Sequence, residues 1–148
     1  MITNILVPYD FTNYADLAFN EALEIAKKFN SKITLLTIIG SDINTSGMSA
    51  SRAQEVFDEV ENKTKEDMAK VQNSNIVENV TVSVEIIHNP STADGILSFA
   101  EKNKTDLIVM GSHGRSGFKK LVLGSVASEV VTKSNCRVLI VKPSKHTK

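Results

Sequence analysis

Five short apolar runs alternate with four helix-like segments along this chain, and this alternation limits its fold more than any other feature. The apolar runs lie near residues 3–9, 32–39, 80–88, 106–110 and 137–142. Strands separated by helices are joined by right-handed crossovers, so consecutive strands run parallel. A chain of 148 residues is also the size of one ordinary domain. We therefore expect a single α/β domain over residues 1–148, with a Rossmann-like, open, parallel five-stranded sheet and helices on both faces.

The helix-like segments are identified by apolar spacing and by residues that favour helix starts. The first lies near residues 14–29, with Asn13 as its expected N-cap. The third begins after Ser91 as its cap, and the fourth begins at Ser125. The second covers residues 51–73 and carries an apolar stripe that we expect in the core. This stripe consists of Ala53, Val56, Phe57, Val60, Met68 and Val71.

Composition argues against several classes of function. The 17 basic and 17 acidic residues cancel, which disfavours a nucleic acid or an anionic membrane surface as partner. No apolar run approaches the roughly 20 residues that span a bilayer, and residues 1–4 lack the positive charge that is typical of the start of a signal peptide. The one cysteine, Cys136, cannot form an internal disulfide, which fits a reducing compartment. We expect a cytoplasmic protein without a membrane partner.

A glycine-rich segment joins the fourth apolar run to the fourth helix. It contains four of the seven glycines, namely Gly111, Gly114, Gly117 and Gly124. Glycine lets the backbone approach an anion and take positive φ, and the N–H groups at a helix start point toward negative charge. The segment therefore predicts a phosphate-binding loop. The chain has no G-x-x-x-x-G-K-[ST] loop and no G-x-G-x-x-G after the first strand, which disfavours NAD and FAD.

The spacing Gly111-x2-Gly114-x9-Gly124-Ser125 resembles the motif of the universal stress protein family in its ATP-binding branch. The resemblance extends from residues 5–10 to residues 138–143. It implies the strand order 3-2-1-4-5, with the third and fifth strands at the edges. It also implies that ATP is bound, with Mg²⁺, and that these glycines and Ser125 surround its ribose and phosphates.

With this strand order, the expected site lies between the first and fourth strands, where the order reverses. Asp10 would accept hydrogen bonds from ribose hydroxyls or the adenine edge, or would only stabilise the turn into the first helix. Pro8 and Ile38 match the family's adenine slot, although either could be plain core. The full set of expected ligand-binding residues is Pro8, Asp10, Ile38, Met110, Gly111, Gly114, Arg115, Gly124, Ser125 and Val126.

Other residues near the glycines are weaker candidates. Of the loop cations Arg115, Lys119 and Lys120, we expect at most one to contact phosphate. His113 has no carboxylate or nucleophile at a readable spacing, so a surface or ribose-facing position is expected rather than catalysis. The three histidines show no metal-ligand spacing, and neither a metal site nor a catalytic residue is expected. Many family members have Gly-Ser after the aspartate, where this chain has Phe11 and Thr12.

These features predict an ATP-binding regulator or sensor in the stress response, in which ATP biases a conformation or an assembly state. A slow ATPase or phosphotransferase is one alternative, although no base or Mg²⁺-binding carboxylate is evident in the loop. A nucleotide-independent interaction module is another, and the intact glycine motif argues against it. Residues 138–142 are apolar almost throughout at an expected sheet edge, which predicts a homodimer formed through the last strand.

Overall fold

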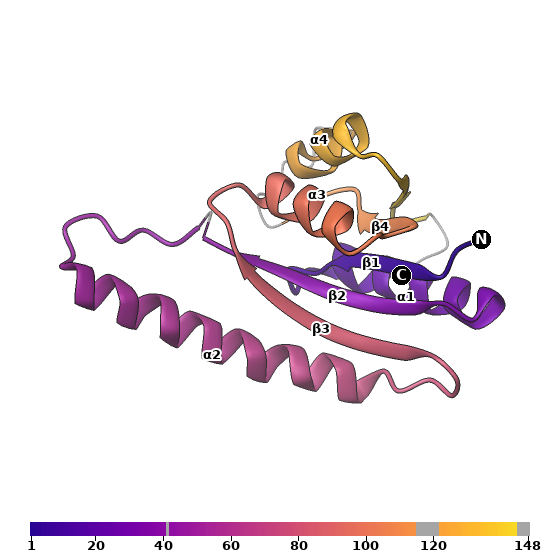
Figure 1. Ribbon diagram of the computed structural model, residues 1–148, viewed down its shortest axis with the longest axis horizontal. Coiled ribbons are helices and arrows are strands. Elements are labelled where there is room, and N and C mark those ends of the chain that lie inside the picture. Colours follow the sequence, from indigo (N-terminus) through magenta and orange to yellow (C-terminus); the bar gives the residue numbers. More distant parts are fainter. Residues whose placement is uncertain (41, 115–121, 145–148) are drawn as a thin grey trace.

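The structure is a computed structural model that describes residues 1–40, 42–114 and 122–144. The described residues form a five-stranded sheet in the order β3-β2-β1-β4-β5, and all neighbouring strands are parallel (Figure 1). The strands are β1 (Asn4–Pro8), β2 (Lys32–Ile39), β3 (Thr81–His88), β4 (Leu107–Gly111) and β5 (Arg137–Val141), and the helices are α1 (Asn13–Phe29), α2 (Ala50–Ser74), α3 (Thr92–Lys102) and α4 (Ser125–Lys133). The expected fold class and strand order are confirmed, with β3 and β5 at the edges.

Two apolar layers hold the helices on opposite faces of the sheet. Along β1, the buried side chains of Ile5 and Val7 join the layer under α1 and α2, whereas Leu6 joins the layer under α3 and α4. This alternation follows from the period of two along a strand. Figure 1 shows α3 and α4 together on one side of the sheet. None of the helices in the described ranges is long and apolar enough to cross a membrane.

Two helix starts test the expected caps. The Ser91 hydroxyl accepts a hydrogen bond from the N–H of Asp94 at 3.2 Å, so the cap of α3 is confirmed. The expected cap Asn13 is wrong, because Thr12 precedes α1 and its hydroxyl accepts from the N–H of Ala15 at 3.2 Å. Thr12 takes this position because the preceding turn is held by the carboxylate of Asp10, which binds both the N–H and the hydroxyl of Thr12.

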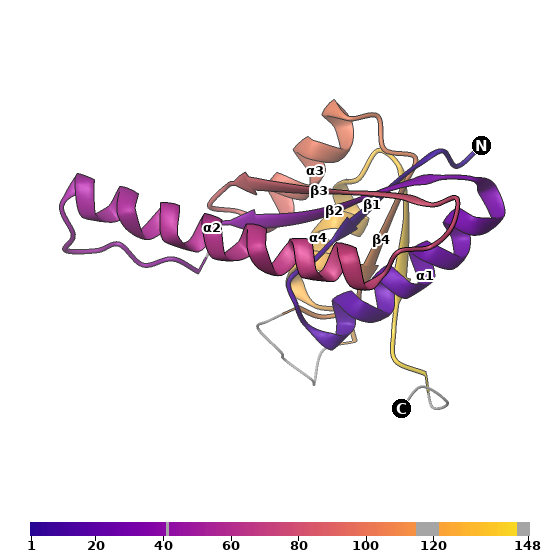
Figure 2. The same ribbon diagram turned by 90° about the horizontal axis from the view of Figure 1, so that it is seen from below.

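The first half of α2 departs from the expected core stripe. The helix has 25 residues and β3 has eight, so α2 is longer than the strand it covers and its start projects beyond the sheet (Figure 2). Met68 alone is fully buried among the described α2 residues, while Val56 and Phe57 stay partly exposed. The second half covers β3, and the Gln72 side chain donates to the carbonyl of Val82 at 2.6 Å.

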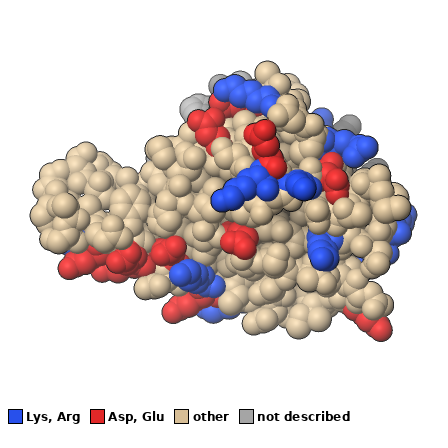
Figure 3. All heavy atoms as spheres, in the orientation of Figure 1, with Lys and Arg blue, Asp and Glu red and all other residues tan. Residues whose placement is uncertain are grey.

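The charged side chains are intermixed on the face drawn in Figure 3, where Lys and Arg lie between Asp and Glu over the body of the molecule. The part that projects at the left is mostly uncharged on this face, with acidic side chains along its lower margin. On this face the basic and acidic side chains are interspersed, and the basic ones do not form one large area.

Candidate functional site

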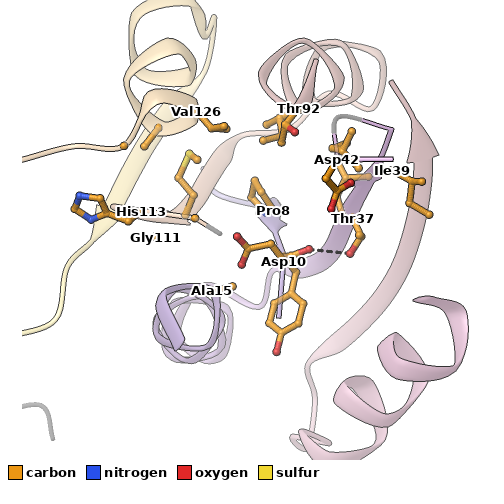
Figure 4. Close-up of a pocket in the computed structure, with 18 of the residues that line it drawn as sticks. Pro8, Asp10, Ala15, Thr37, Ile39, Asp42, Thr92, Gly111, His113 and Val126 are labelled. Atoms are coloured by element: carbon orange, nitrogen blue, oxygen red, sulfur yellow. Dashed lines mark hydrogen bonds between the residues drawn. The ribbon is translucent and has the colours of Figure 1, made fainter. Parts of the chain in front are cut away.

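A cavity of about 480 Å³ lies at the carboxyl ends of β1, β2 and β4 (Figure 4). Its size is within the range of about 300–1,000 Å³ that is usual for small-molecule sites. Nine of the ten expected ligand-binding residues line it, namely Pro8, Asp10, Ile38, Met110, Gly111, Gly114, Gly124, Ser125 and Val126. The tenth, Arg115, lies outside the described residues, as do Lys119 and Lys120.

The position of the cavity follows from the chain path around two neighbouring strands. β1 and β4 pair directly, with Ile5 beside Leu107 and Leu6 beside Ile108. After β1 the chain crosses to the face that carries α1, and after β4 it crosses to the face that carries α4. The two connections diverge, and a crevice opens between them at the carboxyl ends of the strands.

Asp10 has the expected role of stabilising the turn into α1, and it also lines the cavity. Its Oδ1 accepts hydrogen bonds from the Thr12 N–H at 3.1 Å and from the Thr12 hydroxyl at 2.5 Å, which stabilises the turn into α1. Its Oδ2 faces the glycine loop, because a Cβ built on Gly114 would lie only 3.0 Å from that atom. One oxygen of this carboxylate therefore supports the turn, and the other lies beside Gly114 at the cavity.

Phe11 stands where many members of the family that this sequence resembles have glycine. Its φ of 65° lies in the left-handed region that favours glycine. The ring lies edge-on to Tyr9, with ring centroids 5.1 Å apart, and packs against the core layer beneath α1. Packing of the ring offsets part of the cost of this backbone conformation in a residue other than glycine.

The opposing effects of ring packing and backbone strain predict which of two Phe11 variants is more stable. Phe11→Gly loses the ring but relieves the left-handed strain, whereas Phe11→Ala loses the ring and keeps the strain. Phe11→Gly is therefore expected to be more stable than Phe11→Ala by about 1 kcal/mol. Urea unfolding of both variants and the parent measures this difference. An alanine variant that is as stable as the glycine variant would contradict the assignment of strain.

The contacts that an added Cβ would make differ among the three loop glycines, Gly111, Gly114 and Gly124. A Cβ on Gly111 would lie 2.7 Å from Tyr14 Cβ and 2.9 Å from the Tyr14 carbonyl oxygen, so this glycine lets α1 pack closely on β4. A Cβ on Gly124 would lie 3.1 Å from the Ser112 carbonyl oxygen. Neither Gly114 nor Gly124 has positive φ, so of the two reasons expected for glycine in this loop, left-handed backbone does not apply at these two positions.

The start of α4 forms one end of the cavity. Its N-cap is Gly124, which makes no side-chain capping bond, and its first turn carries no acidic residue. The other described helices are capped by the side chains of Thr12, Ser49 and Ser91. The first N–H groups of α4 adjoin the cavity through Ser125 and Val126. Such groups, with the positive end of the helix dipole, favour an anion.

Polar side chains that the sequence analysis did not identify line other parts of the cavity: Thr37, Asp42, Thr64 and Thr92. Thr37 is buried at the end of β2, and its hydroxyl donates to the Tyr9 carbonyl at 2.8 Å, shown as a dashed line in Figure 4. The position of Thr37 could have been predicted from the strand pattern, since it lies at the carboxyl end of a central strand. Thr64 gave no such signal, because its place depends on the path of α2.

The buried hydroxyl of Tyr9 has a structural role at the site. Burial raises the pKa of Tyr9 well above its usual range, and the hydrogen bond from its hydroxyl to the Asp16 carboxylate raises it further. The phenol is therefore neutral at physiological pH and fixes the start of α1 beneath Asp10.

The cavity combines a series of features that suit one kind of molecule. The carboxylates of Asp10 and Asp42 supply hydrogen-bond acceptors, and the described lining residues include neither Lys nor Arg. Apolar side chains of Pro8, Ile38 and Met110 lie along its walls. The start of α4 supplies N–H donors. A flat group with donors at one end and an anionic group at the other would satisfy all three parts.

Comparison with known proteins identifies the family to which this chain is similar. The model of the universal stress protein family matches residues 1–142. The universal stress protein MJ0531 of Methanocaldococcus jannaschii is 32% identical over 143 residues, which cover 95% of this chain and 82% of that protein. The universal stress protein MJ0577 of the same organism is 30% identical, over 96% of both chains.

Solved structures share the fold over almost the whole chain. The structure of MJ0577 matches with a TM-score of 0.85 and 28% identity, over 98% of this chain and 99% of that one. A universal stress protein in complex with cAMP matches with a TM-score of 0.66 and 21% identity, over 96% of this chain and 98% of that one. One from Archaeoglobus fulgidus in complex with dAMP matches with a TM-score of 0.63 and 16% identity, over the same shares.

Proposed function

The chain belongs to the universal stress protein family, and we propose that it binds ATP, with Mg²⁺, and acts as a nucleotide-dependent regulator in the stress response. The observation that carries this proposal is the cavity with carboxylate acceptors at Asp10 and the uncapped start of α4 in its lining. The adenine amino group and the ribose hydroxyls can donate hydrogen bonds to the carboxylate of Asp10. Phosphate oxygens can accept hydrogen bonds from the N–H groups at the start of α4.

The chemistry of the cavity sets the orientation of the ligand. The adenine ring would lie between Pro8, Ile38 and Met110, where apolar surface is available on several sides. The phosphates would lie at Ser125 and Val126, away from the charge of Asp42. Two proteins with this fold were solved with cAMP and dAMP, which supports an adenine nucleotide as the ligand class.

The nature of the bound molecule can be tested without choosing a ligand in advance. Protein purified under native conditions is denatured, and the small molecules released are identified by mass spectrometry. An adenine nucleotide at about one per chain, lost in a variant of the glycine loop, is the expected result. Release of a different class of molecule from the same cavity would contradict the proposal. Purified protein that neither releases nor binds a nucleotide would favour the interaction-module alternative.

ATP hydrolysis is expected to be slow or absent. Phosphoryl transfer needs a positioned nucleophile and compensation of the charge that develops on the γ-phosphate. The cavity supplies backbone N–H donors at the start of α4. Its two carboxylates, Asp10 and Asp42, lie in the parts proposed to hold the nucleoside and not the phosphates. A phosphate-release assay should therefore give a rate well below the roughly 1–100 s⁻¹ of kinases. A rate in that range that disappears in Gly124→Val would support the ATPase alternative instead.

A homodimer through β5 is proposed from the contrast between the two sheet edges. The β3 edge is covered by α2, whose Gln72 side chain satisfies the carbonyl of Val82. In β5, four apolar residues in a row stay partly exposed, and Val131 of the neighbouring α4 is 47% exposed. Antiparallel pairing with a second β5 would bury these side chains and close at two subunits.

The dimer proposal is tested by proline in the middle of the strand. Ile140→Pro removes an N–H and disfavours strand pairing, so it is expected to be monomeric where the parent is dimeric. Sedimentation equilibrium at micromolar concentrations measures both, with Ile140→Val as the matched control that should remain dimeric. A parent that stays monomeric, or a folded proline variant that dimerises like the parent, would overturn the proposal.

A further inference from the structure

Ser112 joins three parts of the molecule although it does not line the cavity. It follows β4 directly and is 1% exposed. Its N–H donates to the carbonyl of Val141 at the end of β5, 3.2 Å away, and its carbonyl accepts from the N–H of Gly124 at 2.7 Å. The backbone of Ser112 therefore fixes the N-cap of α4 relative to the sheet.

The side chain of Ser112 forms the third connection. Its Oγ lies 3.1 Å from Nδ1 of His113, which is its hydrogen-bond partner among the described residues. A buried hydroxyl needs an acceptor for its proton, so Oγ donates and Nδ1 accepts. In a neutral imidazole the other nitrogen, Nε2, then carries the proton and is a donor.

His113 is held next to the anionic end of the cavity. Its ring lies against Tyr14, with ring centroids 5.3 Å apart, and its Cα would be 3.3 Å from a Cβ on Gly124. Figure 4 shows it at the edge of the cavity beside Gly111. An imidazole that donates from Nε2 at this place suits phosphate oxygens, which only accept.

We propose that Ser112 is the positioning residue for the phosphate end of the cavity and acts through His113. Its hydroxyl keeps the proton of the imidazole on Nε2 and holds the ring beside the start of α4, where Nε2 donates to a phosphate oxygen of the ligand. This inference rests on the proposed nucleotide function and adds a residue outside the cavity to it. Recognition of the nucleoside end, which lies with Asp10 and Ile38, does not depend on Ser112.

Titration calorimetry with ATP, AMP and adenosine separates positioning from general support of the fold. Ser112→Ala is expected to weaken ATP and AMP about tenfold and to leave adenosine within about twofold. The matched control is Ser31→Ala, because Ser31 is 2% exposed and its hydroxyl donates to the Ile2 carbonyl at 2.6 Å, at the opposite end of the sheet. This control should leave all three affinities unchanged.

A double-mutant cycle and a spectroscopic measurement test the route through His113. If Ser112 acts through the imidazole, Ser112→Ala causes no further loss of ATP affinity when made in His113→Ala. Nitrogen-15 NMR of the imidazole should show the Nε2–H tautomer in the parent and a shift toward a mixture in Ser112→Ala. The NMR result needs no ligand and applies even if the cycle variants are unstable.

Three results would overturn the proposal: equal weakening of adenosine and ATP in Ser112→Ala, full additivity in the cycle, or an Nδ1–H tautomer in the parent. A parent that binds none of the three ligands but shows the expected tautomer would instead overturn the proposed nucleotide function, and with it the phosphate role of His113. The two failures are thus distinguishable.

Discussion

Gly111→Ala is expected to lower the free energy of unfolding by about 3 kcal/mol, the upper end of the usual cost of overpacking. The new Cβ would lie 2.7 Å from Tyr14 Cβ and 2.9 Å from the Tyr14 carbonyl oxygen. Neither atom is the far end of a flexible side chain, so α1 must move away from β4. That movement opens the layer in which Ala15 and Ala18 are buried.

Urea unfolding measures this loss, and Gly114→Ala is its matched control. A Cβ on Gly114 would meet only the carboxylate of Asp10, at 3.0 Å, and that side chain can rotate. The control is therefore expected to lose less than about 1 kcal/mol. Equal stability of the two variants would show that the close contact of α1 with β4 is not what requires glycine at position 111.

Gly124→Val is expected to weaken ATP binding about 100-fold, the value of one or two hydrogen bonds to a charged group. Its backbone has φ −65°, which valine tolerates, so the cause is steric. The side chain would press on the Ser112 carbonyl, which lies 3.1 Å from the new Cβ and accepts the N–H of Gly124. The start of α4 would shift, and its N–H groups would no longer converge on the phosphates.

The fold should survive this change, at a cost of about 1–3 kcal/mol. Circular dichroism and urea unfolding establish that the variant is folded before its affinity is measured by calorimetry. Adenosine serves as an internal control, because the part of the cavity proposed to hold the nucleoside is formed by β1, β2 and β4. A folded Gly124→Val that binds ATP like the parent would place the phosphates elsewhere.

Much of the fold was predictable because it depends on periodic patterns. The alternation of apolar runs with helices fixes the parallel sheet, and the half-polar pattern of β3 predicts an edge strand. The expected core stripe of α2 is only partly buried: Met68 lies in the core and Val71 packs against it, whereas Val56 and Phe57 stay partly exposed. Its spacing shows one apolar face, but whether a sheet lies beneath that face depends on where the helix starts relative to β3.

The site was predictable to the extent that it lies at strand ends. Asp10 and Gly111 directly follow or end strands, so their positions follow from topology. The reason for each glycine did not follow, because close contacts such as that of Gly111 with Tyr14 arise only when helices pack. For the same reason neither the place of Thr64 in the cavity lining nor the role proposed for Ser112 could be predicted from spacing.

The central claim is that the cavity binds ATP with its phosphates at the start of α4. Calorimetric titration of the nucleotide-free protein with ATP and GTP, each in excess Mg²⁺, tests it most directly. The adenine amino group can donate to a carboxylate such as Asp10, whereas guanine has a carbonyl there. We predict one ATP per chain, bound at least about tenfold more tightly than GTP. Absence of ATP binding, or equal affinity for ATP and GTP, would contradict the account.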